Sequence, residues 1–274
     1  MVREIPDTLK AMLNEYVFNL KIYFGSKVYG VYIYNSVALG TFDEAKSDID
    51  FVTIINEEFT GEEIEALKRL HKQLNARFKF AKRLEGMYIR IEDIGKLNSD
   101  IKPYPYFADE KLKIGYYDIN AVTWWTLKNY GIGVKSSSIS KLNIEVSWKE
   151  VVKNMDYNLN WYWKGKLSSK IIFLSDYWVE FSVLTLCRIL YTLKKRDITA
   201  KVKAADEALK ELPDDFKLIV KEALRIRNCS SKKSLYKFRI IRAIEAKKLI
   251  EYVIRYCNNA YFQISNHEEI AERS

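Results

Sequence analysis

The first half of the chain carries hydrophobic residues at both helical and strand-like spacing. Residues 6–24 have apolar side chains at helical spacing, and Pro6 followed by Asp7 is typical of a helix start. Residues 28–34 (VYGVYIY) are β-branched and aromatic, and residues 48–56 (DIDFVTIIN) alternate before becoming continuously apolar. Both of these segments therefore predict strands.

The next segments complete a mixed α/β unit. Residues 61–78 predict a helix with acids in its first turn and bases in its last, an order that complements the helix dipole. Residues 87–94 (MYIRIEDI) predict a third strand. An order of helix, strand, turn, strand, helix and strand favours a small mixed sheet covered by helices.

The second half is helical throughout. Residues 118–131 predict a helix that ends at Gly131, and no further strand pattern follows it. The expected helices after that point lie near 146–164, 173–195, 199–210, 213–227 and 233–262. We therefore expect an α+β chain with two domains, residues 1–145 with the sheet and residues 146–274 as an all-helical bundle, and a cleft between them.

Composition narrows the class of protein. Hydrophobic residues make up 48% of the 274 residues, which is ample for a packed core. The three cysteines, Cys187, Cys229 and Cys257, are widely spaced and form no metal or disulfide motif, which is typical of a reducing compartment. The N-terminus shows no signal-peptide pattern, and no apolar run is long enough for a membrane span, so we expect a cytoplasmic protein with no membrane partner.

The net positive charge of the chain comes from its second half. Residues 1–150 hold 21 basic and 21 acidic residues, whereas residues 151–274 hold 24 basic and 15 acidic ones. A basic half can indicate a polyanionic partner such as a nucleotide triphosphate, or simply a solvated helical surface. The bases are scattered along amphipathic helices rather than gathered in one run, which favours the solvated surface.

Histidine chemistry is not expected. His71 lies in a charged helical stretch and His267 in the polar C-terminal segment, and we expect both at the surface. This excludes Ser-His-Asp and Cys-His catalysis. Carboxylates must therefore carry any proton or metal chemistry.

Asp48 and Asp50 form the first candidate site. They flank Ile49 at the start of a strand, where residues two apart point to the same face. Two such carboxylates repel each other unless a cation lies between them, and Mg²⁺ prefers hard oxygen ligands shared with phosphate. Ser47 precedes them, and the turn at Asn35 and Ser36 could present backbone N–H groups and a hydroxyl to an anion.

A third acid is expected at the start of the next strand. Glu85 is followed by Gly86, which allows close approach, and its carboxylate could act as a general base toward a hydroxyl. Glu92 and Asp93 at the other end of that strand are rival candidates. A purely structural role for Glu85 would be an ion pair with Lys82 or Arg83.

These motifs resemble a known family. The first half resembles the polymerase-β-like core of the nucleotidyltransferase superfamily. The resemblance lies in the order of its parts: a strand, a small-residue turn, the sequence Ser47-Asp48-Ile49-Asp50, a strand, a helix and a strand with Glu85. Residues 181–216 (FSVLTLCRILYTLKKRDITAKVKAADEALKELPDDF) are similar to the helical domain of streptomycin and spectinomycin adenylyltransferases. Together the two regions span most of the chain.

The resemblance implies an antibiotic-resistance enzyme that transfers AMP from ATP to an acceptor hydroxyl and releases pyrophosphate. It implies that Asp48, Asp50 and Glu85 hold Mg²⁺ and that Glu85 is the base. The residues that it implies in nucleotide binding are Asn35, Ser36, Ser47, Arg188 and Lys201. The family's turn is Gly-Ser, whereas here Asn35 replaces the glycine; Asn tolerates left-handed backbone, so we expect the turn to be kept.

The acceptor implied by the resemblance is a small, polyhydroxylated cation. Such a ligand favours carboxylates and aromatic faces. The candidates are Asp176, Glu180, Trp161 and Trp163. The tryptophans could instead pack between helices, as we expect for Trp124 and Trp125.

Other functions remain open at this point. The acceptor could be another small molecule, such as a lincosamide, or a protein hydroxyl. A non-catalytic nucleic-acid-binding protein is a remote alternative that would show steeply salt-dependent binding. No heptad pattern or exposed apolar stripe stands out, so we expect a monomer, and nucleotide residues in both domains predict closure on ATP.

Overall fold

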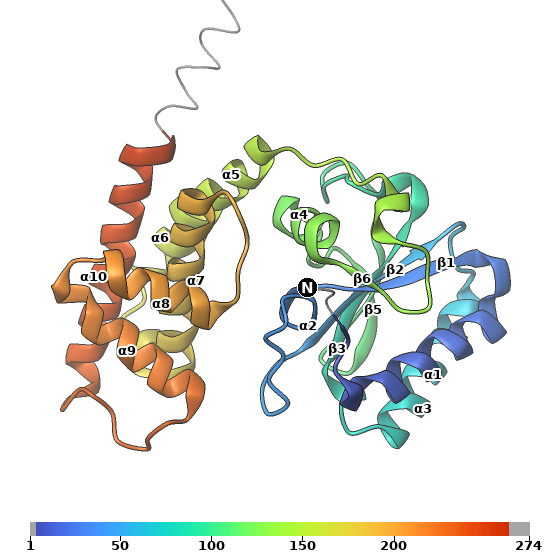
Figure 1. The fold of residues 1–274 in the computed structure, drawn as a ribbon, viewed down its shortest axis with the longest axis horizontal. Coiled ribbons are helices and arrows are strands. Elements are labelled where there is room, and N and C mark those ends of the chain that lie inside the picture. The colour runs from blue at the N-terminus through green and yellow to red at the C-terminus, as the bar shows by residue number, and fades with distance from the viewer. Residues whose placement is uncertain (1–3, 263–274) are drawn as a thin grey trace, which may run out of the picture. The chain divides into compact units, whose positions relative to one another are not determined.

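The chain folds into two compact units. The computed structural model describes residues 4–262 and divides the chain into Met1–Ser147 and Trp148–Ser274. The first unit is built on a sheet and the second is helical, which confirms the predicted α+β class (Figure 1). No helix within residues 4–262 is long and apolar enough to cross a membrane.

The first unit contains a mixed sheet with the order β5-β4-β3-β2-β1-β6. Only the pair β2–β3 is parallel among the pairings of these strands, and the others are antiparallel. The strands are β1 (Val28–Ile33), β2 (Ile49–Ile55), β3 (Leu84–Arg90), β4 (Tyr104–Ala108), β5 (Lys111–Gly115) and β6 (Ile132–Gly133).

Helices cover both faces of this sheet. The first face packs against α1 (Asp7–Phe24) and α3 (Gly61–Arg77), and the opposite face against α4 (Ala121–Tyr130) (Figure 1). Alternate residues of β1 divide between the two cores: Val31 lies on the α1 side and Tyr32 on the α4 side. The strands are therefore buried on both faces, as their continuous apolar sequences predicted.

Gly86 sets the spacing of the parallel pair. A Cβ atom at this position would lie 2.2 Å from the carbonyl oxygen of Phe51 on β2. Only glycine fits this approach, and the register places Phe51 opposite Gly86 and Asp50 opposite Glu85. The glycine thus holds the acidic ends of β2 and β3 together.

The second unit is a bundle around α7. Helices α8, α9 and α10 all pack against α7. The helices are α5 (Trp148–Tyr157), α6 (Lys164–Lys166), α7 (Asp176–Lys195), α8 (Lys201–Glu211), α9 (Asp214–Asn228) and α10 (Arg239–Cys257), with π-helical turns at Asn158–Trp163 and Asn258–Phe262. A 3₁₀ turn lies at Ile172–Leu174.

The first unit also contains the short helix α2 (Asn35–Ala38). Its 3₁₀ turns lie at Gly25–Lys27, Ala81–Arg83, Ile91–Asp93 and Ile139–Leu142.

A buried ionic cluster ties three helices of the second unit together. Glu222 of α9 is fully buried, and its carboxylate accepts hydrogen bonds from Arg225, Arg242 and the Ser234 hydroxyl. Arg242 of α10 also pairs with Asp176 of α7 at 2.7 Å. Burial alone would raise the pKa of Glu222, but these hydrogen bonds lower it to about 2.

Several element boundaries differ from the sequence prediction. The third strand spans Leu84–Arg90 rather than 87–94, because residues 91–93 turn into a 3₁₀ helix in which Asp93 pairs with Arg90 at 2.8 Å. The last long helix begins at Arg239, not at residue 233. Strands β4, β5 and β6 were not predicted.

His71 was wrongly expected at the surface. It is 1% exposed, and its ring stacks on Phe107 with centroids 3.7 Å apart. Its Nε2 lies 2.6 Å from the hydroxyl of Tyr88, which in turn lies 2.7 Å from the hydroxyl of Tyr16. Burial lowers the pKa of His71 to about 3, so the ring is neutral at pH 7. His267 lies outside the described residues.

Candidate active site

The three predicted acids lie at the N-terminal ends of β2 and β3, the parallel pair in the middle of the sheet. Asp50 is the second residue of β2, Asp48 immediately precedes the strand, and Glu85 is the second residue of β3. Asp50 and Glu85 are register partners in the parallel pair. By alternation both side chains belong to the face that α4 covers, so the acids share one side of the sheet.

Asp50 lies where negative charge accumulates. Its pKa is raised to about 8, first by burial and then by the nearby carboxylate of Asp118, with further contributions from Asp48 and Glu85. A hydrogen bond from Asn35 opposes this shift. Burial and the neighbouring carboxylates thus disfavour the charged form of Asp50. A bound cation would stabilise that charged form.

Glu85 is held by a tyrosine and not by the neighbouring bases. The Tyr117 hydroxyl donates to Glu85 Oε2 at 2.6 Å. Burial raises the pKa of Glu85, and the Tyr117 hydrogen bond opposes this shift. The alternative ion pairs are formed elsewhere: Lys82 pairs with Glu110, and Arg83 donates to the carbonyl oxygens of Glu44 and Ala45.

The rival acids lie at the far end of β3. Glu92 and Asp93 both pair with Arg90, at 2.5 and 2.8 Å. Asp93 is also 5% exposed and accepts a hydrogen bond from Lys96. These contacts give both residues a structural role, so Glu85 is the better candidate for the base.

The turn after β1 has the predicted left-handed backbone. Asn35 adopts φ 50°, a conformation that Asn tolerates better than most residues other than glycine. Ser36 donates from Oγ to the carbonyl oxygen of Asp48 at 3.2 Å, which joins the turn to the acidic segment. Asn35 and Ser36 thus both contact the segment that carries the two aspartates.

Ser47 lies beside the acids but has a structural contact. It is 3% exposed, and its hydroxyl accepts a hydrogen bond from the backbone N–H of Asp43 at 2.9 Å. This contact closes the loop that leads into β2. A direct role for Ser47 in phosphate binding stays a prediction.

Three residues near the acids were not predicted. Asp118 is the charge that acts most strongly on Asp50, and Tyr117 donates a hydrogen bond to Glu85. Tyr34 is buried, and burial together with these carboxylates raises its pKa well above the usual value. Asp118 and Tyr117 lie just before α4, whose helix start at Asn120 was the nearest signal in the sequence.

The donor set fits a hard cation, although it is not a closed metal site. Within residues 4–262, no three acidic, cysteine or histidine side chains gather closely enough to hold a metal ion as they stand. Asp48, Asp50 and Glu85 nevertheless offer only oxygen ligands, and the neighbouring carboxylates add to burial in raising the pKa of Asp50. Oxygen donors with room for water and phosphate are what Mg²⁺ uses.

The predicted nucleotide residues of the second unit lie on neighbouring helices. Arg188 is half-buried on α7, and Lys201 is the first residue of α8. The Lys201 Nζ lies 5.8 Å from the centroid of the Phe181 ring, a cation–π distance. Their action on the same nucleotide as the first unit's acids stays a prediction.

Both acidic candidates for acceptor binding are already ion-paired. Asp176 pairs with Arg242, and Glu180 pairs with Arg227 at 3.1 Å. Asp176 keeps half of its side chain exposed, whereas Glu180 and Arg227 are each about one-fifth exposed. Asp176 is therefore the more accessible carboxylate of the two.

The two tryptophan candidates differ. Trp161 is 74% exposed and stacks on Tyr157, so its face is available to a ligand. Trp163 is fully buried against Tyr162 and Phe181, which matches the core-packing alternative, and its role in acceptor binding stays a prediction. Trp124 is likewise fully buried, as expected, and Trp125 is half-buried.

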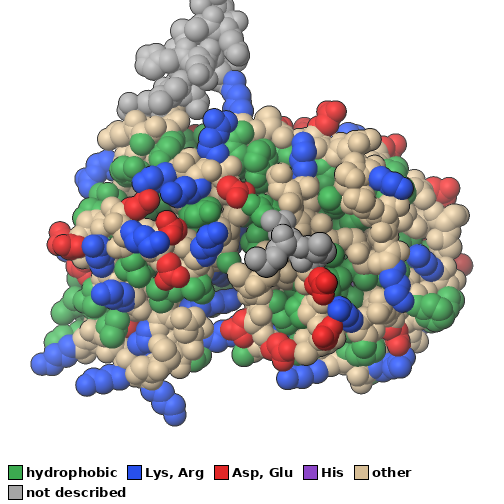
Figure 2. Space-filling model, viewed as in Figure 1, with side chains coloured by type: hydrophobic (Ala, Val, Ile, Leu, Met, Phe, Trp, Pro, Cys, Tyr) green, Lys and Arg blue, Asp and Glu red, His purple; other side chains and the backbone are tan. Residues whose placement is uncertain are grey.

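Basic side chains do not form a continuous patch on the face shown in Figure 2. Blue Lys and Arg side chains of the helical unit are interspersed with red acidic and green hydrophobic ones. Several lysines of this unit also pair with nearby acids, as Lys194 does with Glu211 and Lys248 with Glu245. This dispersion is typical of a solvated surface and does not favour a nucleic-acid interface.

Comparison with known proteins supports the resemblance found in the sequence. Residues 169–266 match the family model of the aminoglycoside adenylyltransferase C-terminal domain. A solved structure of spectinomycin adenyltransferase AAD(9) from Enterococcus faecialis, with ATP and spectinomycin, is similar at a TM-score of 0.64 and 13% identity. That match covers 88% of this chain and 98% of the other. No curated protein sequence matches the chain significantly.

These findings confirm the predicted resemblance and the fold. The C-terminal match lies within the helical unit, in the same region that the sequence pattern of residues 181–216 indicated. The family match also supports the prediction of a nucleotidyltransferase enzyme.

Proposed function

We propose that this chain, whose residues 169–266 match the aminoglycoside adenylyltransferase C-terminal domain, transfers AMP from ATP to a hydroxyl of an aminoglycoside-type antibiotic in a Mg²⁺-dependent reaction. The observation that carries this proposal is the register pair Asp50–Glu85 beside Asp48, with the pKa of Asp50 raised to about 8. Such a set of acids suits a cation and an anionic substrate. The AAD(9) structure that shares the fold contains ATP and spectinomycin.

Asp48, Asp50 and Glu85 would hold the metal. When bound, Mg²⁺ would offset the negative charge of the triphosphate and of the attacked phosphorus. Asn35 supports this set from the preceding turn, because its side chain hydrogen-bonds to Asp50. Ser36 fixes the position of the turn through the Asp48 carbonyl oxygen.

Glu85 would act as the general base. The acceptor hydroxyl oxygen bonds to the α-phosphorus of ATP, the bond from that phosphorus to the pyrophosphate oxygen breaks, and the hydroxyl proton passes to Glu85. Tyr117 donates to Oε2, which keeps a second lone pair for the metal, so Oε1 would take the proton. Burial raises the pKa of Glu85, which makes its carboxylate a stronger base than an exposed one.

The helical unit would supply the cationic side chains. Lys201 and Arg188 would contact the triphosphate, because Lys and Arg stabilise the charge on a transferring phosphoryl group. We expect the reaction in the cytoplasm, where ATP is present and where the free thiols of Cys187, Cys229 and Cys257 are stable.

The acceptor is the least constrained part of the proposal. Trp161 and the exposed half of Asp176 offer the aromatic and acidic contacts that a cationic antibiotic needs. The pairing of Asp176 with Arg242 and of Glu180 with Arg227 reduces the acidic character of that region. This observation favours, as a second candidate, transfer to a less cationic small molecule or to a protein hydroxyl.

A pyrophosphate-release assay tests the proposal. The purified protein is incubated with ATP, Mg²⁺ and each of a panel that contains spectinomycin, streptomycin and other aminoglycosides. We expect release with at least one antibiotic, lost in Asp48→Asn and Glu85→Gln, while both variants keep the wild-type thermal unfolding temperature. Release with no antibiotic, despite bound ATP, would refute an aminoglycoside acceptor. Labelled AMP on the protein would support the protein-hydroxyl candidate.

A further inference from the structure

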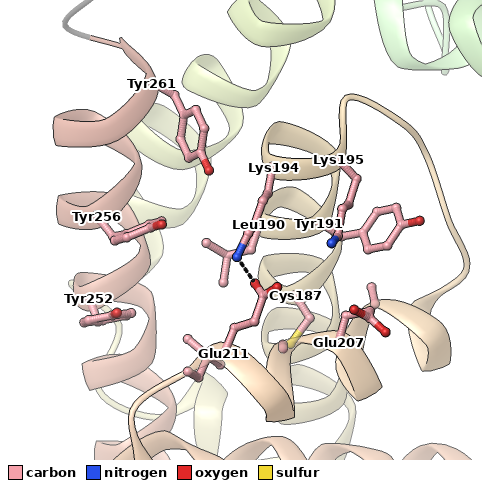
Figure 3. A pocket seen from close by; sticks show the side chains of 13 residues that line it. Cys187, Leu190, Tyr191, Lys194, Lys195, Glu207, Glu211, Tyr252, Tyr256 and Tyr261 are labelled. Carbon is pink, nitrogen blue, oxygen red and sulfur yellow. Dashed lines mark ion pairs between the residues drawn. The ribbon is translucent and has the colours of Figure 1, made fainter.

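A pocket in the helical unit is lined by none of the residues assigned to the reaction. It has a volume of about 90 Å³ and lies among α7, α8, α10 and the π-helical turn that follows α10 (Figure 3). Its lining contains neither Arg188 nor Lys201, and none of the acceptor candidates. Adenylyl transfer therefore gives no reason for this pocket.

The floor of the pocket is apolar and made of small side chains. Cys187 on α7 is 1% exposed, and Ala204 and Ala208 on α8 are 0% and 6% exposed. The two alanines lie one turn apart on the same face of α8, so their short side chains leave space above them. Burial raises the pKa of the Cys187 thiol to about 12, which keeps this part of the floor uncharged.

One wall consists of tyrosine rings. Tyr252 and Tyr256 stack with their centroids 6.1 Å apart, and Tyr261 meets Tyr256 edge to face at 6.2 Å. Figure 3 shows these three rings in a column on α10 and the turn after it, facing the α7 side of the pocket. Tyr256 keeps 40% of its surface exposed, so part of its ring is available for stacking.

The charged side chains that line the pocket balance one another. Lys194 of α7 pairs with Glu211 of α8 at 2.8 Å, and this ion pair lies among the side chains that line the pocket (Figure 3). Lys195 and Glu207 also line the pocket, so two bases face two acids. A charged ligand would gain little from this balanced set, whereas a neutral ligand with a donor and an acceptor could hydrogen-bond to both sides of the pair.

The size and chemistry of the pocket together define a ligand class. A volume near 90 Å³ holds several waters or one ring system, since one water needs roughly 10–15 Å³. Waters on the apolar floor would lack the two to four polar partners that hold an ordered water. We propose that this pocket binds a small, neutral, planar aromatic molecule of one or two rings, stacked on Tyr256 with its polar edge at Lys194 and Glu211.

Indole is a suitable probe for this site. Its affinity for the full-length protein is measured by saturation-transfer NMR, with cyclohexanol as a ring that lacks a π-face. We expect indole to bind about tenfold more tightly than cyclohexanol, because ring stacking contributes beyond buried area. Equal affinities would overturn the aromatic assignment, and the absence of indole binding would overturn the site. Indole binding should persist in saturating ATP, and displacement by ATP would place indole in the nucleotide site instead.

Two variants locate the binding in this pocket. Ala208→Leu fills the space above the floor and should abolish indole binding while the protein still unfolds cooperatively. Tyr256→Ala removes the exposed ring and should weaken indole about tenfold. The matched control is Tyr157→Ala, which removes an exposed tyrosine of the same unit outside the pocket lining. Should Ala208→Leu fail to fold, Tyr256→Ala decides the question, since wild-type affinity in that variant refutes the site.

Discussion

The hydroxyl of Tyr117 donates a hydrogen bond of 2.6 Å to Oε2 of Glu85. This contact joins the segment before α4 to the start of β3, and it directs one carboxylate oxygen of the proposed base. The Tyr117 ring is held in turn by parallel stacking on Tyr106, with centroids 4.9 Å apart. In the proposed reaction, Tyr117 is therefore a positioning residue for Glu85.

We expect Tyr117→Phe to lower kcat for AMP transfer about tenfold, because a hydrogen bond to a charged group is lost. The KM for ATP should change little, since the ring and its stacking remain. Steady-state kinetics of pyrophosphate release measure both constants. The matched control is Tyr116→Phe, which removes the hydroxyl of an exposed neighbour that donates to the Ile101 carbonyl oxygen. An equal loss of kcat in both variants would contradict the positioning role.

The left-handed turn at Asn35 gives a prediction about stability. Asn35→Ala should lower the free energy of unfolding by about 1–2 kcal/mol, because Ala pays the full cost of a left-handed backbone at φ 50°. Asn35→Gly should lower it less, since glycine adopts this conformation freely but loses the hydrogen bond to Asp50. Urea denaturation compares the two variants, and an alanine variant as stable as the glycine variant would show that the turn is not strained.

The buried His71 makes stability depend on pH. Its pKa is about 3 in the folded chain and about 6.5 when exposed, so the unfolded chain binds more protons between these values. Its contribution to the free energy of unfolding is complete above about pH 6.5 and falls as the pH drops toward 3, by at most about 1.4 kcal/mol per pH unit.

His71→Phe keeps the stacking on Phe107 but removes the titrating group. Urea denaturation at pH 7 and pH 5 should show a smaller loss of stability on acidification in this variant than in the wild type. The comparison between the two proteins cancels the contribution of the carboxylates that both contain. An identical pH dependence would mean that His71 is not buried in solution.

The ionic cluster of the helical unit should be sensitive to the loss of one charge. Glu222→Gln leaves Arg242 buried without its carboxylate partner on α9, so the free energy of unfolding should fall by about 3–5 kcal/mol. Chemical denaturation followed by circular dichroism measures the change. Glu251→Gln, an exposed acid on α10, is the control and should have little effect.

The sequence predicted those residues of the acidic site whose positions follow from short-range patterns and from the pairing of neighbouring strands. Asp48 and Asp50 share a face because strand residues two apart always do, and Glu85 joins them because β2 and β3 are parallel neighbours. Asp118 and Tyr117 reach the same place through chain folding over more than 30 residues, and no local pattern indicates that approach. Their contribution appears only when the fold is known.

Other differences have similar causes. The hairpin of β4 and β5 was not predicted because β4 contains Pro105 and β5 is an edge strand of only five residues, too short for its alternation to stand out. His71 was placed at the surface because its sequence neighbours are charged. Its burial arises from Phe107 on β4, a residue whose strand was not predicted either.

Gly86 has a consequence for how mutational data on this protein should be interpreted. Every side chain at this position would collide with the Phe51 backbone. In a saturation screen for antibiotic resistance, position 86 should tolerate no substitution, as Asp50 should, although glycine offers no side chain to nucleotide, metal or acceptor. Intolerance at position 86 would therefore reflect the close approach of β2 and β3. A map of mutation-sensitive positions that included Gly86 would make the set of residues with a chemical role look larger than it is.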